Sequence, residues 1–263
     1  MPLFLKDPLM QAEDQLAPFG MALACLAAAF QAVSISRSTA PVIVGGAAVV
    51  ILTAGTFFSG DFDFVHPDDA AISQALLEHG FVEERRPGML RIGWYHPEHP
   101  GFGFQQVSGT LFDGRSERSR QLIVGLPGGG EIRLPAVEDM IADRLGQHSV
   151  ASPTDRSRLD QARVMLALSE GIDPIYLRRR IEDEGGDPAL LADIAVPASQ
   201  AGVLDLEGMW ARAAARRAAL GITGDWDERM RNRGGSRTPE KQALLQGMQD
   251  RGRNVRRPGN GGR

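Results

Sequence analysis

The chain contains a single cysteine, Cys25, among 263 residues, and aromatic residues make up only 6% of it. One cysteine excludes an intramolecular disulfide and any zinc site built from several cysteines. No apolar run reaches the ~18 residues needed to cross a bilayer; the longest candidate, residues 21–33, is rich in alanine and is interrupted by Gln31. Acidic residues stand where a signal peptide would carry its basic amino-terminal region, at Asp7, Glu13 and Asp14. These absences predict a cytoplasmic protein with no membrane-spanning segment.

The composition suffices for one large domain or two small ones with a sizeable core, because 43% of the residues are hydrophobic and 24% are charged. The net charge of −4 is unevenly distributed. From Arg229 to Arg263 there are ten basic and two acidic residues, a net charge of +8, which leaves −12 for the rest of the chain. A basic tail on an acidic body is typical either of a solvated, disordered terminus or of a segment that contacts polyanions or its own body.

The spacing of apolar residues predicts an α/β (α+β) fold, in which a small mixed sheet flanked by helices precedes a nearly all-helical part. Strands are expected at residues 41–44, 61–65, 81–84, 90–95, 102–107, 122–126 and 131–134. Helices are expected at residues 21–33, 47–54, 67–80, 137–145, 155–170, 174–184 and 203–220. We therefore divide the chain into an N-terminal extension (1–20), an α/β core (21–135), a helical region (136–224) and a basic, disordered tail (225–263).

A diglycine and a strand with two carboxylates follow each other in the first half of the chain. Gly45 and Gly46 would let a phosphate chain approach the backbone closely, and the helix after them offers free N–H groups and a positive dipole end. Asp61 and Asp63 alternate with apolar residues, so they face the same side of a strand, about 6–7 Å apart. Such a pair can hold Mg²⁺ together with substrate phosphates. Taken singly, a Gly-Gly is typical of a turn and an Asp-x-Asp of a solvated strand edge; their order, spacing and the nearby Ser59 make the combination specific.

These residues resemble the signature of the nucleotidyltransferase superfamily with the DNA polymerase β-like fold: a hydrophobic-Gly-Gly/Ser segment, a helix and turn, then Asp-hydrophobic-Asp/Glu-hydrophobic. The spacing Ser59-x-Asp61-x-Asp63 is similar to that of AbiEii-type toxins of type IV toxin–antitoxin systems. The segment 138–145 is similar to the helix that follows the sheet in that group, which has a lysine where this chain has Arg144. Since arginine keeps its proton, Arg144 can clamp a phosphate but cannot act as a base. The resemblance covers about residues 40–170.

The resemblance implies a Mg²⁺- or Mn²⁺-dependent enzyme that transfers a nucleotidyl group from a nucleoside triphosphate to an RNA or protein acceptor. A tRNA end or an antitoxin protein is the kind of partner it suggests, and the arginine-rich tail is compatible with RNA. It also implies roles for particular residues. The metal is expected at Asp61 and Asp63, the phosphates at Gly45, Gly46 and Ser59, and the triphosphate or leaving pyrophosphate at Arg144.

One departure from the superfamily pattern keeps a second function open. The third carboxylate usually comes from a neighbouring strand, and the strand at residues 102–107 carries Gln105 and Gln106 there. An amide oxygen can ligate a metal but brings no charge, so Asp113 and Glu131 are alternative sources of the third carboxylate. The alternative function is a catalytically impaired nucleotide-binding or regulatory protein of the same fold. A third hypothesis makes the tail the functional part, as a nucleic-acid-associated scaffold.

Three further features have plain structural interpretations. His96 and His99 have a spacing that suits a metal, but the sequence places no cysteine beside them, which favours an incidental pair in a loop. Cys25 lies in an alanine-rich apolar segment and is expected to be a small buried hydrophobe. Arg144 stands beside Asp143, so a helix-surface ion pair is the alternative to a role in phosphate binding.

Overall fold

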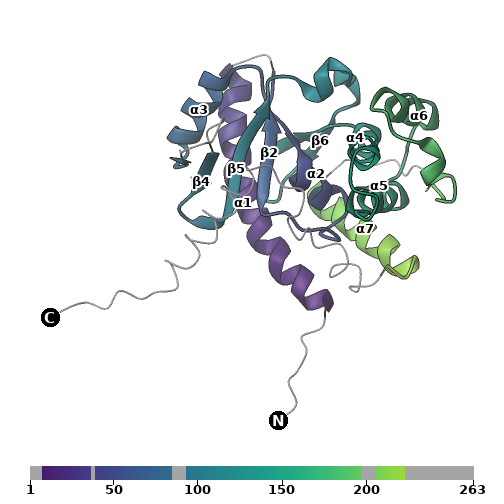
Figure 1. Cartoon of the computed structure of the whole chain (residues 1–263). Coiled ribbons are helices and arrows are strands. Elements are labelled where there is room, and N and C mark those ends of the chain that lie inside the picture. Colours follow the sequence, from purple (N-terminus) through teal and green to yellow (C-terminus); the bar gives the residue numbers. More distant parts are fainter. Residues whose placement is uncertain (1–7, 37–38, 85–92, 197–204, 223–263) are drawn as a thin grey trace, which may run out of the picture.

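The computed structural model describes residues 8–36, 39–84, 93–196 and 205–222 of the chain, and side chains from residue 16 onward except those at positions 35 and 36. The expected basic tail at 225–263 lies outside these residues. The described part is a mixed α/β fold, as the sequence predicts. Figure 1 shows a sheet with α1 (Pro8–Ser36) and α3 (Asp69–Glu78) on one side and most of the other helices on the opposite side.

The main sheet has five strands in the order β1-β2-β5-β4-β3. The strands β2 and β5 are parallel and the other neighbours are antiparallel. Their bounds are Val42–Val44 (β1), Asp61–Val65 (β2), Val82–Glu84 (β3), Gly93–His96 (β4) and His99–Ser108 (β5). A separate antiparallel pair is formed by β6 (Leu122–Gly125) and β7 (Glu131–Leu134).

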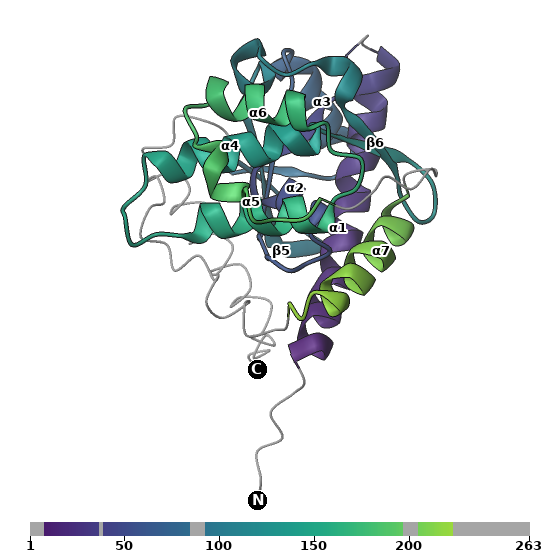
Figure 2. The ribbon, with the colours of Figure 1, turned by 90° about the vertical axis from the view of Figure 1, so that its right-hand side faces the viewer.

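The helical half follows β7. It contains α4 (Val137–Ser149), α5 (Ser157–Leu168), α6 (Pro174–Asp183) and α7 (Leu206–Ala219), with 3-10 turns at Leu111–Gly114, Arg118–Arg120 and Pro188–Leu191. Figure 2 shows α4 between α5 and α6, and α7 contacts α2 (Gly45–Leu52) and α5. These helices reach the sheet through α2, an apolar helix whose residues from Ala47 to Leu52 are all buried. The sheet and the helical half therefore share one core.

The first helix is longer than the sequence pattern predicts. It begins at Pro8 rather than at residue 21 and contains Pro18, so the expected boundary of an N-terminal extension at residue 20 falls inside a helix. An internal proline costs about 3 kcal/mol because it removes one hydrogen bond and crowds the preceding turn. Phe19 and Leu23 are fully buried just after it, and burial of side chains of that size offsets the cost.

Because α1 extends past Pro18, the expectation that no apolar run could span a bilayer is wrong. The segment Leu16–Ser34, 19 residues long, is long and apolar enough to cross a membrane. In the fold, 44% of this segment is buried, with Phe19 stacked on Phe62 and Phe30 against Phe64. Core helices of soluble proteins pass the same test of length and composition, so α1 is only weak support for a membrane location.

The alternation in β2 separates its aromatic residues from its acids, as the sequence predicts. Phe62 and Phe64 pack against α1, and Phe62 also stacks on Phe104 of β5. Successive side chains of a strand point to opposite faces, so Asp61 and Asp63 face the side of the sheet where α2 lies. An apolar layer of aromatic rings therefore packs against the α1 side of β2. The two carboxylates lie on the other side of the strand, toward the helical half.

Candidate functional site

The diglycine begins a helix and lies directly against Asp63. Gly45 and Gly46 are the first two residues of α2, whereas the sequence pattern predicts a turn followed by a helix from residue 47. Gly45 has a φ of +65°, a conformation that glycine adopts easily, and this lets the chain pass from β1 straight into the helix. A Cβ added to Gly45 would lie 2.5 Å from Oδ2 of Asp63 and 3.1 Å from its Cβ. A side chain at position 45 would therefore occupy the space that the Asp63 carboxylate uses.

Ser59 lies against Gly46 in the same way as Asp63 lies against Gly45. A Cβ added to Gly46 would lie 2.7 Å from Cβ of Ser59 and would overlap its hydroxyl oxygen. The same hydroxyl accepts a hydrogen bond from the backbone N–H of Asp61 at 3.3 Å. Five of the predicted site residues are thus brought together at the start of α2 and β2: Gly45, Gly46, Ser59, Asp61 and Asp63.

The carboxylates of Asp61 and Asp63 are nearly inaccessible to solvent. Asp61 is 3% exposed and Asp63 is 8% exposed. Burial of two neighbouring acids on one strand face is costly unless charges or hydrogen bonds compensate them. Hard divalent cations prefer oxygen ligands of this kind, and glycine at position 45 lets the Asp63 carboxylate lie directly against the start of α2. The donor set therefore fits Mg²⁺ or Mn²⁺.

Gln105 completes this face of the sheet. It is the register partner of Asp63 in the parallel pair of β2 and β5, and it is 6% exposed. Register partners in a sheet point to the same face. The position where the resemblance calls for a third carboxylate is therefore next to Asp63, and it carries a neutral amide.

The other candidates for a third metal ligand lie elsewhere. Gln106 points to the opposite face from Gln105, where its amide donates hydrogen bonds to the carbonyl oxygen of His66 and to Oδ1 of Asp69. Asp113 is exposed in the first 3-10 turn with a φ of +53°. Glu131 is exposed in β7, in the separate two-stranded sheet.

Arg144 is buried, so its pair with Asp143 is not the helix-surface ion pair that the sequence offers as an alternative. It lies on α4, its side chain is 4% exposed, and its Nη1 donates to Oε1 of Gln147 at 2.9 Å. The Oδ2 atom of Asp143 is 3.8 Å from the same nitrogen. The buried Nε and Nη2 atoms have no hydrogen-bond partner among the residues that the structure describes. Buried guanidinium donors normally find acceptors, so this arginine is ready to bind an anion.

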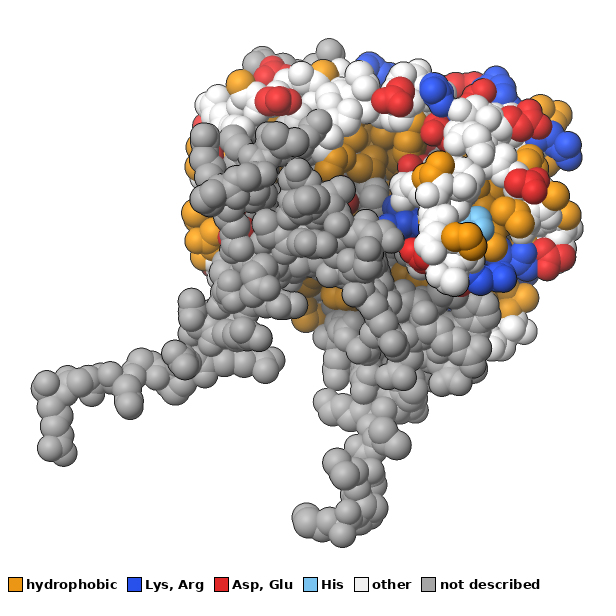
Figure 3. Space-filling model, in the orientation of Figure 1, with side chains coloured by type: hydrophobic (Ala, Val, Ile, Leu, Met, Phe, Trp, Pro, Cys, Tyr) orange, Lys and Arg blue, Asp and Glu red, His pale blue; other side chains and the backbone are white. Residues whose placement is uncertain are grey.

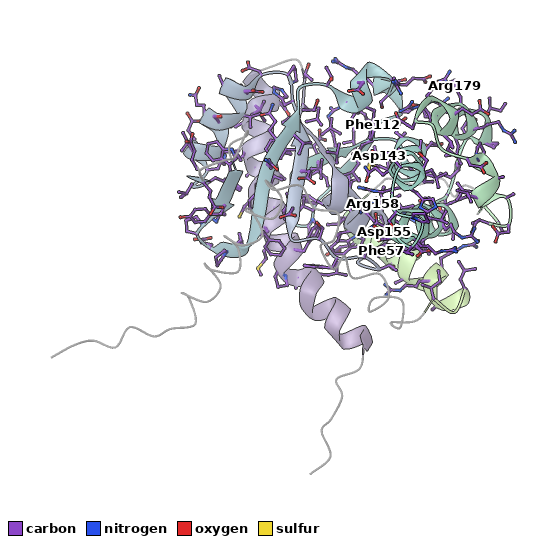
Figure 4. All side chains as sticks on the ribbon, viewed as in Figure 1. Phe57, Phe112, Asp143, Asp155, Arg158 and Arg179 are labelled. Atoms are coloured by element: carbon purple, nitrogen blue, oxygen red, sulfur yellow. The ribbon has the colours of Figure 1, made fainter. Side chains whose placement is uncertain are left out.

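A second arginine, Arg158, belongs to the same site and was not singled out from the sequence. It lies on α5, and Figure 4 shows it between Asp143 and Asp155. Burial and the neighbouring Arg144 lower the pKa of Arg158, while Asp143, Asp155 and Asp63 act in the opposite direction. One guanidinium therefore lies within electrostatic reach of both Arg144 and the acidic strand. Only packing of α5 against α4 creates this pairing, so sequence spacing gave no signal for it.

The site has acidic groups on the sheet and basic groups on the helices that face it. In Figure 3 acidic (red) and basic (blue) side chains meet at the border between the sheet and the helical half. Two guanidinium groups close enough to lower the pKa of one of them repel each other, and an anion between them and the acidic strand would relieve that repulsion. A metal-bound phosphate chain would match this arrangement, with the cation next to the acids and the phosphates next to the arginines.

A separate cavity of about 450 Å³ lies at the other end of β1 and β2. Its lining includes Val42, Val65, Ser116, Arg118 and Arg133. None of the predicted site residues lines it. It is therefore distinct from the candidate site, which is defined by the glycines, the acids and the two arginines.

Comparison with protein-family models and with curated proteins finds no match for this chain. Among solved structures, the chain is similar to the crystal structure of JHP933 from Helicobacter pylori, with 14% sequence identity, a TM-score of 0.39, and coverage of 89% of this chain and 94% of that chain. A similarity at this level does not indicate the fold or the activity of this chain. The functional conclusion therefore rests on the site itself.

Proposed function

We propose that this protein is a divalent-metal-dependent nucleotidyltransferase, which transfers a nucleotidyl group from a nucleoside triphosphate to an RNA or protein acceptor. The observation that carries the proposal is the contact between the start of α2 and Asp63, where a Cβ on Gly45 would fall 2.5 Å from the carboxylate. This contact brings together the N-terminus of α2, which favours binding of phosphate, and the carboxylates of β2, which favour binding of a metal ion. Either feature alone is common, and their direct contact supports the proposal.

In this function Asp61 and Asp63 would hold Mg²⁺ or Mn²⁺, which supplies neutralisation of phosphate charge when bound. The backbone N–H groups at Gly45 and Gly46, with the hydroxyl of Ser59, would orient the phosphate chain. Arg144 and Arg158 would bind the β- and γ-phosphates and stabilise the leaving pyrophosphate through charge-assisted hydrogen bonds. The acceptor oxygen attacks the α-phosphorus, the bond to the β-phosphate oxygen breaks, and pyrophosphate leaves, so the chain contributes positioning and charge rather than a covalent intermediate.

A second function is favoured by one specific observation, the amide of Gln105 beside Asp63. Without a third negative charge the site would bind the metal more weakly. This supports a protein that binds nucleotide and metal but turns over slowly or not at all, in a regulatory role. The two functions predict the same ligand and differ in pyrophosphate release.

The setting of this activity is also part of the proposal. We place the protein in the cytoplasm, where nucleoside triphosphates are available, and we propose a tRNA end or an antitoxin protein as its partner. The basic segment from Arg229 to Arg263 supports an RNA partner by its charge alone. Deletion of residues 229–263 followed by RNA binding at increasing salt tests this part, and unchanged affinity would eliminate a role for the tail.

The direct experiment incubates the purified chain with α-labelled nucleoside triphosphates, Mg²⁺ and total RNA or candidate proteins. Label on an acceptor and pyrophosphate in solution are measured together. We expect both to appear with the wild-type chain and to fall about 1,000-fold or more with Asp61→Asn and Asp63→Asn, because the metal contributes several kcal/mol to the transition state.

The matched control for these variants is Asp113→Asn. It also replaces one carboxylate by an amide, at an exposed position whose positive φ asparagine accepts. Equal labelling by wild type and Asp63→Asn would contradict the assigned roles. Metal-dependent thermal stabilisation by nucleotides with no pyrophosphate release would support the non-catalytic function instead.

A further inference from the structure

A cluster of one cysteine and two histidines lies on the other face of the sheet from Asp61 and Asp63. Cys25 comes from α1, His96 from the end of β4 and His99 from the start of β5. One ligating atom from each of the three lies within 4.8 Å of the other two. The Sγ atom of Cys25 is 3.3 Å from Nε2 of His99.

The fold brings these residues together in two steps. The β4–β5 hairpin makes His96 and His99 register partners across the two-residue connection at Pro97 and Glu98, with ring centroids 5.4 Å apart. The helix α1 then packs along β5 and places Cys25 beside them, 74 positions away from His99 in sequence. The sequence predicts a pair of histidines in a loop with no cysteine beside them. Both points are wrong, because His96 and His99 belong to β4 and β5 and Cys25 contacts His99. Cys25 is half-buried and hydrogen-bonded rather than a purely apolar side chain.

We propose that Cys25, His96 and His99 form a binding site for a transition metal ion, with Zn²⁺ as the fitting occupant. One thiolate and two imidazoles are a donor set for a borderline-soft cation and a poor one for Mg²⁺. Zinc bonds of about 2.3 Å to sulfur and about 2.0–2.1 Å to nitrogen place tetrahedral ligand atoms about 3.3–3.7 Å apart. The Cys25–His99 distance of 3.3 Å is close to this requirement. All three ligand atoms lie within 4.8 Å of one another, so the ligands need to shift by no more than about 1–1.5 Å.

The surroundings of the cluster favour the ligating form of the histidine but not that of the cysteine. Burial and the neighbouring His96 lower the pKa of His99, which keeps its imidazole neutral and able to ligate. Burial and the Glu98 carboxylate raise the pKa of the Cys25 thiol. Metal binding therefore displaces one proton from Cys25 to solvent as one bond to sulfur and two to nitrogen form. The charge of Glu98 favours a cation at the cluster, and a water molecule would take the fourth position.

The site is independent of the proposed nucleotidyltransferase activity. It joins α1 to the β4–β5 hairpin on the face of the sheet that carries the aromatic core, away from the start of α2. A bound metal ion would link α1, a helix of 29 residues, to the β4–β5 hairpin. A ligand that binds only the folded chain stabilises it in proportion to the logarithm of its concentration over its dissociation constant.

The test uses the full-length chain, stripped with a chelator and titrated with Co²⁺ and then Zn²⁺ in the presence of excess Mg²⁺. We expect one equivalent of Co²⁺ to give the thiolate-to-cobalt charge-transfer band and the intense visible bands of tetrahedral coordination, and Zn²⁺ to displace it. We also expect Zn²⁺ to raise the melting temperature at a ratio of one ion per chain.

The variants Cys25→Ser, which is near-isosteric, and His96→Asn and His99→Asn, which remove the imidazole, should weaken Zn²⁺ binding about 100-fold or more, and Cys25→Ser should abolish the charge-transfer band. His148→Asn removes an imidazole at the end of α4 and should bind like wild type. Circular dichroism of each stripped variant checks that it is folded, and a variant that is folded and binds Zn²⁺ like wild type overturns the proposal. A Co²⁺ spectrum that Cys25→Ser leaves unchanged would identify an adventitious ion only and would also overturn it.

Discussion

Asp63 and Gln105 are register partners in the neighbouring parallel strands β2 and β5, and both are buried on the face that meets α2. The carboxylate and the amide therefore lie side by side where a metal site of this type would place two carboxylates. This relationship, rather than the Asp-x-Asp spacing alone, determines how much negative charge the site can offer a cation.

Gln105→Glu should tighten binding of Mn²⁺ in the presence of nucleotide by about 10-fold, because it adds one negative charge beside Asp63 in a buried site, where solvent screens charge weakly. Isothermal titration with Mn²⁺ and a non-hydrolysable triphosphate measures the change. Gln74→Glu adds the same charge on the exposed face of α3 and should leave Mn²⁺ binding unaltered. If both variants behave alike, Gln105 does not face the metal.

Gly45→Ala should lose nucleotide binding, because the added Cβ would overlap the Asp63 carboxylate in addition to straining a backbone with a φ of +65°. Gly114→Ala is the matched control. Gly114 has a φ of +82° and open space around its Cβ position, so it carries the same kind of backbone strain without the overlap. Equilibrium nucleotide binding and urea unfolding of both variants separate the two effects. An equal loss of binding in both would show that backbone strain alone is responsible.

Gly46→Ala tests the neighbouring contact with Ser59. The added Cβ would lie 2.7 Å from the Cβ of Ser59, so we expect a loss of stability of about 1–3 kcal/mol from overpacking. Ser59→Gly in the same chain removes the overlap and should restore much of that stability, while the hydroxyl contribution to nucleotide binding stays lost. Denaturant unfolding of the single and double variants gives the coupling, and additive effects would contradict the contact.

Arg158→Ala should raise the dissociation constant of the metal-nucleotide complex about 10–100-fold, the cost of losing charge-assisted hydrogen bonds to phosphate. Arg144→Lys keeps a positive charge but not the forked donors, and should show a smaller increase. Arg163→Ala is the matched control. Arg163 lies on the same helix as Arg158, but it pairs with Asp193 and the carbonyl oxygen of Leu190. Its nucleotide affinity should remain near that of wild type; a loss as large as that of Arg158→Ala would contradict the assignment.

Asp139→Asn should lower the free energy of unfolding by about 3–5 kcal/mol, since it leaves a buried guanidinium without its main partner. Arg180 and Asp139 are both fully buried, with Nε 2.6 Å from Oδ1, and they tie α6 to α4. Asp183→Asn removes a partially exposed partner of the same arginine, 3.3 Å away, and should cost less than about 1 kcal/mol. Urea unfolding compares the two variants, and equal losses would show that burial of the ion pair does not decide its contribution.

The order of elements and the two faces of β2 could be predicted from the sequence because alternation and turn residues are local signals. The internal Pro18 misled the prediction of where α1 begins, since burial of Phe19 and Leu23 outweighs a local rule. Arg158 and Cys25 were not recognised as site residues because their partners lie on other elements. Spacing along one chain cannot show which helix packs on which, and that packing creates both sites.

The most direct measurement is a crystal structure of the chain grown with Mn²⁺ and a non-hydrolysable nucleoside triphosphate, with diffraction recorded at the manganese absorption edge. We predict an anomalous peak between the carboxylates of Asp61 and Asp63, with the triphosphate over the first turn of α2 and its outer phosphates toward Arg144 and Arg158. A nucleotide bound instead in the cavity beside Val42 and Arg133, with no manganese at the two aspartates, would contradict the account.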